Sequence, residues 1–185
     1  VTLTPLDFVE LEFGQVDADF HLMTEEPLDY VFELMEIGKA LPTHGVIGQV
    51  ERMSNIELFV DQVKRVGWMV GLSLDLFTPV EAIEIDELSQ LDTVQVMTIE
   101  AGFQGQQFVQ AALEKVDELV ALRKQRELSF QIMVDGGIKP ELIKLLTKHG
   151  VTGAAVGSGL WDGSGYETNL DQFLSEISSG TPPAK

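Results

Sequence analysis

The chain of 185 residues contains no cysteine, and it has only 12 lysine and arginine residues against 30 aspartate and glutamate residues. Without cysteine there is no disulfide, thiolate ligand or thiol nucleophile, which is typical of a cytoplasmic protein. The formal net charge of −18 argues against binding to nucleic acid or to an anionic membrane surface, because both require clustered basic side chains. An anionic ligand would have to be held locally, by main-chain N–H groups and helix ends.

Long apolar runs are also absent: none approaches the roughly 18 residues of a membrane span. The first residues lack the basic and apolar regions of a signal peptide. Hydrophobic residues nevertheless make up 44% of the chain, which is enough to bury a full core. We therefore expect a single globular domain over residues 1–178, located in the cytoplasm, and a flexible tail over residues 179–185.

Strand-like and helix-like patterns alternate along the chain. Apolar runs that are typical of buried parallel strands begin near residues 18, 45, 68, 93, 130 and 152, and each is followed by a helical pattern. Before them, the spacing of Leu6, Val9 and Phe13 predicts a loop leading into an N-terminal helix. Six strand–helix units indicate a parallel sheet with crossover helices. The pattern alone fits either an open doubly wound sheet or a barrel that is two strands short.

Residues 130–161 hold the clearest chemical signal. One apolar run stops at Asp135-Gly136-Gly137, and the next stops at Gly157-Ser158-Gly159. Glycines allow main-chain N–H groups to approach a ligand closely, and ligands of parallel α/β proteins bind at the carboxyl ends of the strands. An acid beside an anion cradle predicts a phosphorylated substrate, although glycines that only turn the chain would give the same pattern.

Five segments together resemble the ribulose-phosphate 3-epimerase family. Their order and spacing agree with the family pattern over nearly the whole chain, and the combination is far more specific than any one segment. They are Asp19-Phe20-His21-Leu22-Met23, the Thr-Pro-Val-Glu-Ala-Ile of residues 78–83, the run from Val96 to Gln106 that includes Gly-Phe-Gln-Gly-Gln, Val134-Asp135-Gly136-Gly137, and Val156-Gly157-Ser158.

This resemblance implies the ribulose-phosphate-binding type of (β/α)8 TIM barrel, and a correspondence in which the first strand, first helix and second strand are missing from this chain. In the family those segments carry a serine that contacts substrate, and a histidine and an aspartate that bind metal. Six strands would leave two open sheet edges. We therefore do not expect these residues alone to form a stable, active monomer, and we expect a homo-oligomer.

The resemblance also implies an activity, which is the metal-dependent 3-epimerisation of D-ribulose 5-phosphate to D-xylulose 5-phosphate in the pentose phosphate pathway. In the family, proton abstraction and reprotonation at C3 pass through an enediolate held by one divalent metal ion: Zn, Fe, Mn or Co. Carried over, His21 and Asp135 become metal ligands, and Asp135 is also a catalytic acid/base. The substrate and its phosphate would contact His21, Gly102, Phe103, Gln104, Gly105, Gly136, Gly137, Gly157 and Ser158, with Met23 and Met97 as site walls.

Two departures from the family pattern keep other functions open. The chain has Gln49-Val50-Glu51 where the family commonly has His-x-Glu, and Leu74-Asp75-Leu76 where it has Leu-Asn-Pro. An epimerase for a related ketohexose phosphate fits these departures. A non-catalytic sugar-phosphate-binding protein of the same fold also fits, because this chain holds two of the four expected metal ligands. A third, weaker alternative is another phosphate-binding barrel lyase.

Overall fold

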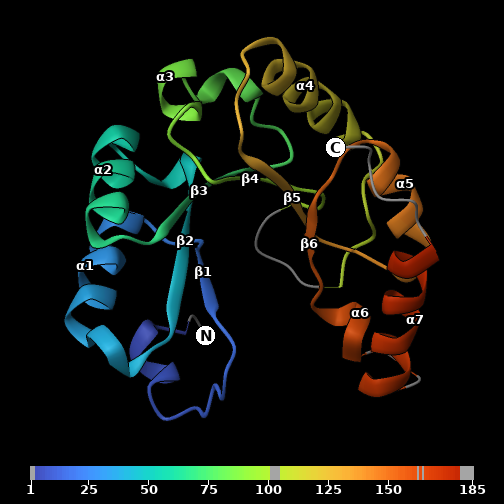
Figure 1. Cartoon of the computed structure of the whole chain (residues 1–185), viewed down its shortest axis with the longest axis horizontal. Helices are drawn as coiled ribbons and strands as arrows, with labels where there is room; N and C mark the ends of the chain where they lie inside the picture. Colours follow the sequence, from blue (N-terminus) through green and yellow to red (C-terminus); the bar gives the residue numbers. More distant parts are fainter. Residues whose placement is uncertain (1–2, 101–104, 162, 164, 180–185) are drawn as a thin grey trace. The chain divides into compact units, whose positions relative to one another are not determined.

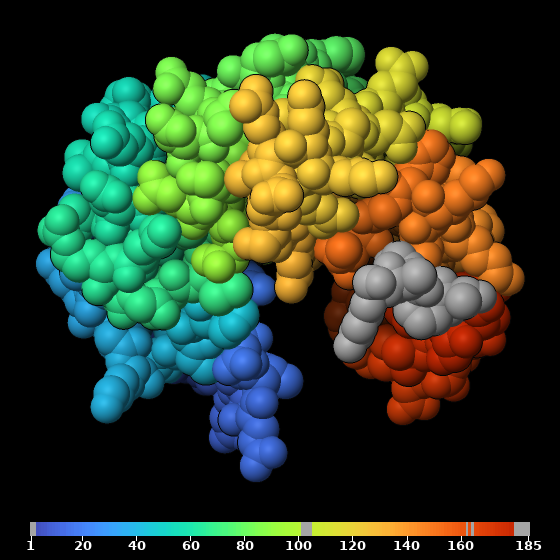
Figure 2. Space-filling view, turned by 45° about the horizontal axis from the view of Figure 1, so that its top comes forward, coloured from blue at the N-terminus to red at the C-terminus, as the bar shows by residue number. Residues whose placement is uncertain are grey.

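The structure is a computed structural model that describes residues 3–100, 105–161, 163 and 165–179 (Figure 1). The chain forms two compact units. The first unit comprises Val1–Ser73 and Ile83–Thr93, and the second comprises Leu74–Ala82 and Val94–Lys185. Each unit can be followed by its colour in Figure 2, the first largely in blue to green and the second largely in yellow to red.

The first unit is built on parallel strands covered by helices. Its strands are β1 (Ala18–Leu22), β2 (Thr43–Gln49) and β3 (Met69–Leu74), and they pair in this order. His21 lies opposite Ile47, which in turn lies opposite Gly71. The helices are α1 (Pro27–Ile37), α2 (Ile56–Val66) and the short α3 (Ile85–Leu88).

Helix α2 shows why these residues fold as they do. The side chain of Asn55 caps the helix by accepting a hydrogen bond from the Leu58 N–H at 2.8 Å, and Gly67 ends it in the left-handed region at φ 89°. Its apolar face is buried and includes Phe59. A Cβ atom on Gly48 of β2 would lie 2.7 Å from the Phe59 ring. Glycine therefore allows the helix to pack closely on the strand.

The second unit continues the same alternation. It contains β4 (Thr93–Met97), α4 (Ala112–Gln125), β5 (Gln131–Asp135), α5 (Ile143–Lys148), β6 (Gly153–Ala155), α6 (Ser158–Trp161) and α7 (Tyr166–Ser179), with the strands in the order β4, β5, β6. Strands β5 and β6 are parallel, with Asp135 opposite Ala155. Buried apolar side chains from strands and helices form its core, among them Val116, Leu119, Phe130, Ile132, Leu146 and Phe173.

The six predicted strands are confirmed, but the predicted N-terminal helix is wrong. Only a short 3-10 helix, Pro5–Phe8, forms in that segment. Leu6 is 61% exposed and Leu11 57% exposed, so the segment lacks the packed apolar face that a short helix needs in water. The blue N-terminal residues stand out from the body of the first unit in Figure 2.

The predicted C-terminal tail is described only in part, and the predicted single domain is not tested. Ser179 belongs to α7, whereas residues 180–185 of the predicted tail lie outside the described residues. The prediction of one domain over residues 1–178 stays a prediction, since the compactness of each unit does not test it. No helix in the described part of the chain is both long enough and apolar enough to cross a membrane.

Candidate functional site

The predicted site residues are divided between the two units. His21 and Met23 belong to the first unit, and Met97, Asp135 and the described glycines belong to the second. Gly102, Phe103 and Gln104 lie outside the described residues. Each half of the predicted site is therefore described within its own unit, and the joint ligation of one metal ion by His21 and Asp135 stays a prediction.

In the first unit, His21 takes part in a hydrogen-bonded relay at the carboxyl ends of β1 and β2. Its Nε2 lies 3.0 Å from Oε1 of Gln49, and Nε2 of Gln49 donates to Oε2 of Glu51 at 2.6 Å. The Gln49 side chain is buried, with 2% of the residue exposed. An ionised carboxylate only accepts hydrogen bonds, so the amide nitrogen faces Glu51 and the amide oxygen faces His21.

The orientation of the Gln49 amide determines the tautomer of the neutral His21 ring. Because the Gln49 oxygen accepts, His21 Nε2 carries the hydrogen, and in the neutral ring the lone pair lies on Nδ1. The sequence presents Gln49 and Glu51 only as a departure from the family pattern. The structure shows that they orient the predicted metal ligand.

A pocket of about 390 Å³ in the first unit is lined by His21, Met23 and Thr24, together with Asp19, Tyr30 and mostly apolar residues of β1 and the N-terminal segment. Met23 is 41% exposed. The hydroxyl oxygen of Thr24 is buried and has no hydrogen-bond partner among the described residues. Two predicted residues, His21 and Met23, thus border one pocket.

In the second unit, Thr98 fixes the main chain around Asp135. The Thr98 N–H donates to the Asp135 carbonyl at 2.8 Å, and its hydroxyl lies 3.0 Å from that oxygen and 2.6 Å from the Gly136 carbonyl. Thr98 is fully buried, so these bonds are shielded from water. The sequence reasoning missed the positioning role of Thr98. Its only signal is a polar side chain in an apolar run, directly after the last residue of β4.

Glycines allow the main chains of three loops to approach each other closely. A Cβ atom on Gly137, whose φ is 65°, would lie 2.5 Å from the Phe108 nitrogen, and one on Gly159 would lie 2.5 Å from the Ile138 carbonyl oxygen. No side chain fits at either place. Gly157 is different, because a Cβ there would meet no atom within 4 Å and its backbone is not left-handed. The fold does not require glycine at position 157, whereas a ligand in the open space beside it would.

These loops enclose a pocket of about 350 Å³ in the second unit. The structure thus brings together Gly105, Gly137 and Ser158, which come from three separate predicted motifs. Met97, by contrast, is buried, and its sulfur accepts a hydrogen bond from Gln95 at 3.8 Å. The remaining lining residues are Gln106, Gln107, Phe108, Ile138, Lys139, Glu141, Leu142 and Gly159.

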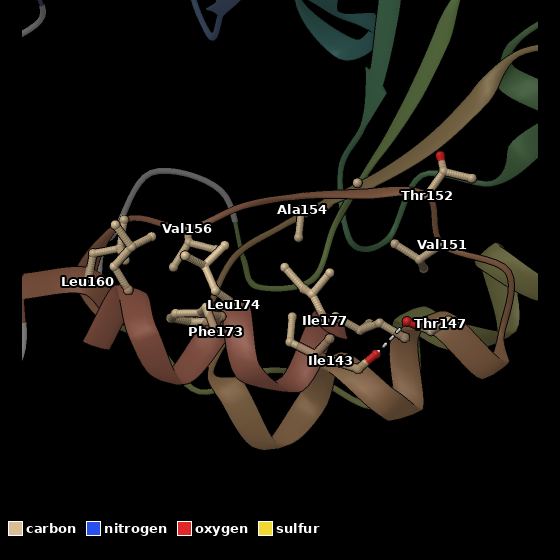
Figure 3. A pocket seen from close by; sticks show the side chains of 13 residues that line it. Ile143, Thr147, Val151, Thr152, Ala154, Val156, Leu160, Phe173, Leu174 and Ile177 are labelled. Carbon is tan, nitrogen blue, oxygen red and sulfur yellow. Dashed lines mark hydrogen bonds between the residues drawn. The ribbon is translucent and has the colours of Figure 1, made fainter. Parts of the chain in front are cut away.

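A second pocket of the same unit, about 450 Å³, lies among α5, β6 and α7 (Figure 3). Phe173, Leu174 and Ile177 of α7 point into it in the close-up view. Among the described residues, no acidic or basic side chain lines it, and two threonines are its only hydroxyl-bearing residues. None of the predicted site residues lines this apolar pocket, so the glycine-lined pocket is the candidate site of the second unit.

The described residues do not complete a metal site. Among them, no group of three or more histidine, cysteine, aspartate or glutamate side chains is arranged to hold an ion. Protein sites for zinc and similar divalent ions use at least three protein ligands. His21 through Nδ1 and the Asp135 carboxylate are chemically suited to such an ion, but they account for only two donors.

Solved structures with the same arrangement of strands and helices define the fold class. Phosphoribosyl anthranilate isomerase from Thermus thermophilus matches with a TM-score of 0.62 and 16% identity, over 90% of this chain and 75% of that one. 3-Keto-L-gulonate-6-phosphate decarboxylase from Vibrio cholerae matches with a TM-score of 0.60 and 15% identity, over 89% and 73%. At such identities the likeness shows the fold alone. The chain therefore has the fold of the (β/α)8 TIM-barrel class, in which six parallel strands are present here.

Sequence comparison defines the family within this class. The sequence model described as "Ribulose-phosphate 3 epimerase family" matches residues 3–161. Ribulose-phosphate 3-epimerase of Treponema pallidum is 32% identical over 162 residues, which cover 88% of this chain and 70% of the relative. The cytoplasmic isoform of Oryza sativa is 35% identical over 145 residues, covering 77% and 60%. The chain belongs to the ribulose-phosphate 3-epimerase family, a family of isomerases, and the resemblance seen in its motifs is confirmed.

Proposed function

We propose that this protein catalyses the 3-epimerisation of a ketose phosphate, D-ribulose 5-phosphate to D-xylulose 5-phosphate. Family membership supports ketose-phosphate epimerisation in general. The observation that carries the proposal is the end of β5, where Asp135 precedes the glycines of the enclosed pocket. Asp135, which would supply the carboxylate for proton transfer, thus lies two residues before Gly137, which lines the pocket proposed to hold the anion.

The reaction requires a proton to leave one face of C3 and another to reach the opposite face. The C3 proton is acidic because it is adjacent to the ketose carbonyl, and its removal yields an enediolate. In this proposal the Asp135 carboxylate exchanges a proton with one face of C3, and the proton that reaches the opposite face derives from solvent. The hydrogen bonds from Thr98 keep the strand end in place, which holds the carboxylate at a constant distance from the bound sugar.

The phosphate of the substrate is proposed to occupy the glycine-lined pocket. Three glycines, Gly105, Gly137 and Gly159, line it, and the close approaches at Gly137 and Gly159 hold the loops together. Main-chain N–H groups suit a phosphate because they bind an anion without adding side-chain charge. A phosphate held there would direct the sugar towards Asp135.

A divalent metal ion, Zn, Fe, Mn or Co, is proposed to bind the same substrate complex. His21 and Asp135 would each donate one ligand, and a bound ion would stabilise negative charge on the enediolate oxygens. Because the described residues supply fewer than three ligands, no catalytic step is assigned to the metal. The homo-oligomeric state and the cytoplasmic location remain proposals of the same kind.

Two alternatives are favoured by specific residues. Gln49 and Asp75 depart from the family pattern at strand ends, which would suit an epimerase for a related ketohexose phosphate. The incomplete ligand set would suit a non-catalytic protein that binds sugar phosphate. The alternative of a barrel lyase predicts C–C cleavage, which neither epimerase hypothesis does.

Exchange of the C3 proton with solvent tests these hypotheses together. The protein is incubated in D2O with D-ribulose 5-phosphate, or with a ketohexose phosphate, and deuterium at C3 is followed by NMR. We expect exchange and xylulose 5-phosphate without cleavage, and a loss of at least about 1,000-fold in Asp135→Asn. Asp117→Asn, which alters a carboxylate paired with His149 at 2.6 Å, is the control and should retain activity.

The possible outcomes are distinct. Exchange with the ketohexose phosphate alone would support the first alternative. Binding of phosphate with no exchange on either sugar would support the non-catalytic alternative. Full activity in Asp135→Asn would contradict the role proposed for this carboxylate.

A further inference from the structure

One basic side chain borders the glycine-lined pocket. Lys139 follows Gly137 and Ile138 at its edge, and its side chain is exposed. Among the residues that the structure describes, Glu141 is the only acidic one that lines the same pocket. In a chain whose net charge is −18, a cation at this position offsets part of the negative potential that an anion would otherwise meet there.

The backbone at Lys139 is held in place from both sides. Ile138 is buried, and its carbonyl oxygen packs against Gly159. Lys139 has an extended conformation, with φ −132° and ψ 159°, and precedes Pro140, which begins a 3-10 helix; a residue before proline is restricted to such conformations. The base of the side chain is thus fixed beside the pocket, and only the side chain itself has to be ordered by a ligand.

Three other basic groups of the second unit already have partners. Lys115 is buried and donates to the carbonyl oxygens of Asp75 and Leu76 at 2.5 and 3.3 Å. Arg123 donates to the Phe130 carbonyl at 2.9 Å, and Lys144 pairs with Glu176 at 3.0 Å. Among the described residues, Lys139 has no acidic partner within ion-pair distance. Its ammonium group is available to an anion in the pocket.

We propose that Lys139 pairs with the phosphate dianion of the substrate and makes the pocket selective for a doubly charged phosphate over neutral or singly charged groups. This inference rests on the proposed function, because it concerns the same pocket. A phosphate ester carries a charge near −2 at neutral pH, and the exposed Glu141 carboxylate would repel it. The ammonium of Lys139 offsets that repulsion and adds a charge-assisted hydrogen bond.

The test compares Lys139→Gln, Lys139→Arg and the control Lys124→Gln, which removes the same charge from α4 outside the pocket lining. The dissociation constant of inorganic phosphate is measured by calorimetry, and KM and kcat are measured with D-ribulose 5-phosphate.

We expect Lys139→Gln to raise both the dissociation constant and KM about tenfold, with kcat and the melting temperature unchanged. Lys139→Arg should lose less than about threefold, and Lys124→Gln should bind like the wild type. The affinity of Lys139→Gln should also depend less on salt concentration.

The outcomes separate this inference from the function on which it rests. If the wild type binds phosphate and Lys139→Gln binds it equally well, the role of Lys139 is overturned while the pocket stands. An equal loss in Lys124→Gln would also overturn it, because the effect would then come from the overall charge. If the wild type binds neither phosphate nor the ketose phosphate, the proposed function fails, and the inference falls with it.

Discussion

The two units hold their polar groups at the strand ends by different means. In the first unit, side chains do the work: Glu51 orients Gln49, and Gln49 orients His21. In the second unit the main chain dominates, with Thr98 bound to carbonyl oxygens and glycines where loops approach each other. The side-chain relay determines which ring nitrogen of His21 carries the lone pair. The loops of the second unit, by contrast, can approach each other only because glycine has no side chain. Substitutions in the two units should therefore have different consequences.

The largest effect is expected at Gly137. In Gly137→Ala the new methyl group would lie 2.5 Å from the Phe108 nitrogen, and its φ of 65° is unfavourable for alanine. We expect a loss of about 3 kcal/mol in the free energy of unfolding, measured by urea denaturation. Gly105→Ala is the control, because φ is 79° there but no atom lies within 4 Å; it should lose only about 1 kcal/mol. Equal losses in both variants would mean that strain, and not loop contact, decides the effect.

Gly157→Ala separates ligand binding from folding. Its added methyl group meets no protein atom within 4 Å and requires no left-handed backbone, so the stability should change by less than about 0.5 kcal/mol. If the open space beside Gly157 receives the phosphate, the same methyl group should weaken phosphate binding by more than about tenfold. Calorimetric titration of the variant measures this. Unchanged binding would remove Gly157 from the phosphate site.

Thr98→Val tests the positioning of Asp135. Valine has nearly the same shape as threonine but cannot donate to the carbonyl oxygens of Asp135 and Gly136, which lie 3.0 and 2.6 Å from the hydroxyl. We expect the free energy of unfolding to fall by about 1–3 kcal/mol. Catalytic activity should fall as well, because the main chain at Asp135 and Gly136 is then held only by the N–H of residue 98 and not by the hydroxyl. Thr98→Ser keeps the hydroxyl and should retain most of the activity; a serine variant as inactive as the valine variant would argue against this role.

Gln49→Met tests the relay of the first unit. Methionine fills a similar volume but neither accepts from His21 nor donates to Glu51. We expect a loss of roughly 1 kcal/mol in stability and a change in the distribution of the His21 ring hydrogen between its two nitrogens. The nitrogen chemical shifts of the ring report this distribution by NMR. Shifts identical to those of the wild type would show that another contact fixes the ring.

The smallest effect is expected from an exposed ion pair in the first unit. The hydrogen bond between His44 Nδ1 and Asp19, 2.9 Å long, raises the pKa of His44 above its usual 6.5. A raised pKa in the folded state stabilises the protein fully below pH 6.5, and the contribution disappears as pH rises through the folded pKa. Because both side chains are about half exposed, the contribution should be well below 1 kcal/mol.

His44→Gln is the matching variant. Relative to the wild type, its urea midpoint should be lower at about pH 5.5 and equal at about pH 8.5. A difference that grows with increasing pH would contradict the assigned sign.

Local patterns were sufficient for the positions of the six strands along the chain and for part of the site. Period and length of the apolar runs predict six buried strands because burial on both faces leaves little choice of residue. The same local view failed at the N-terminus, where Leu6 and Val9 have helical spacing but no surface to pack against. It also missed Thr98, since a hydroxyl in an apolar run gives no sign of the carbonyl groups that it will meet 37 residues further along the chain.

The sequence by itself determined the alternation of strands and helices, the family, and the motifs that contain His21 and Asp135, because each is written in consecutive residues. Tertiary structure alone decided which loops meet around one pocket, that Gln49 and Glu51 orient His21, and that Lys139 lies beside the glycines with no acidic partner in the part of the chain that the structure describes. These features depend on distances between residues far apart in the chain. Such distances are set by packing and hydrogen bonding across strands, which no local pattern records.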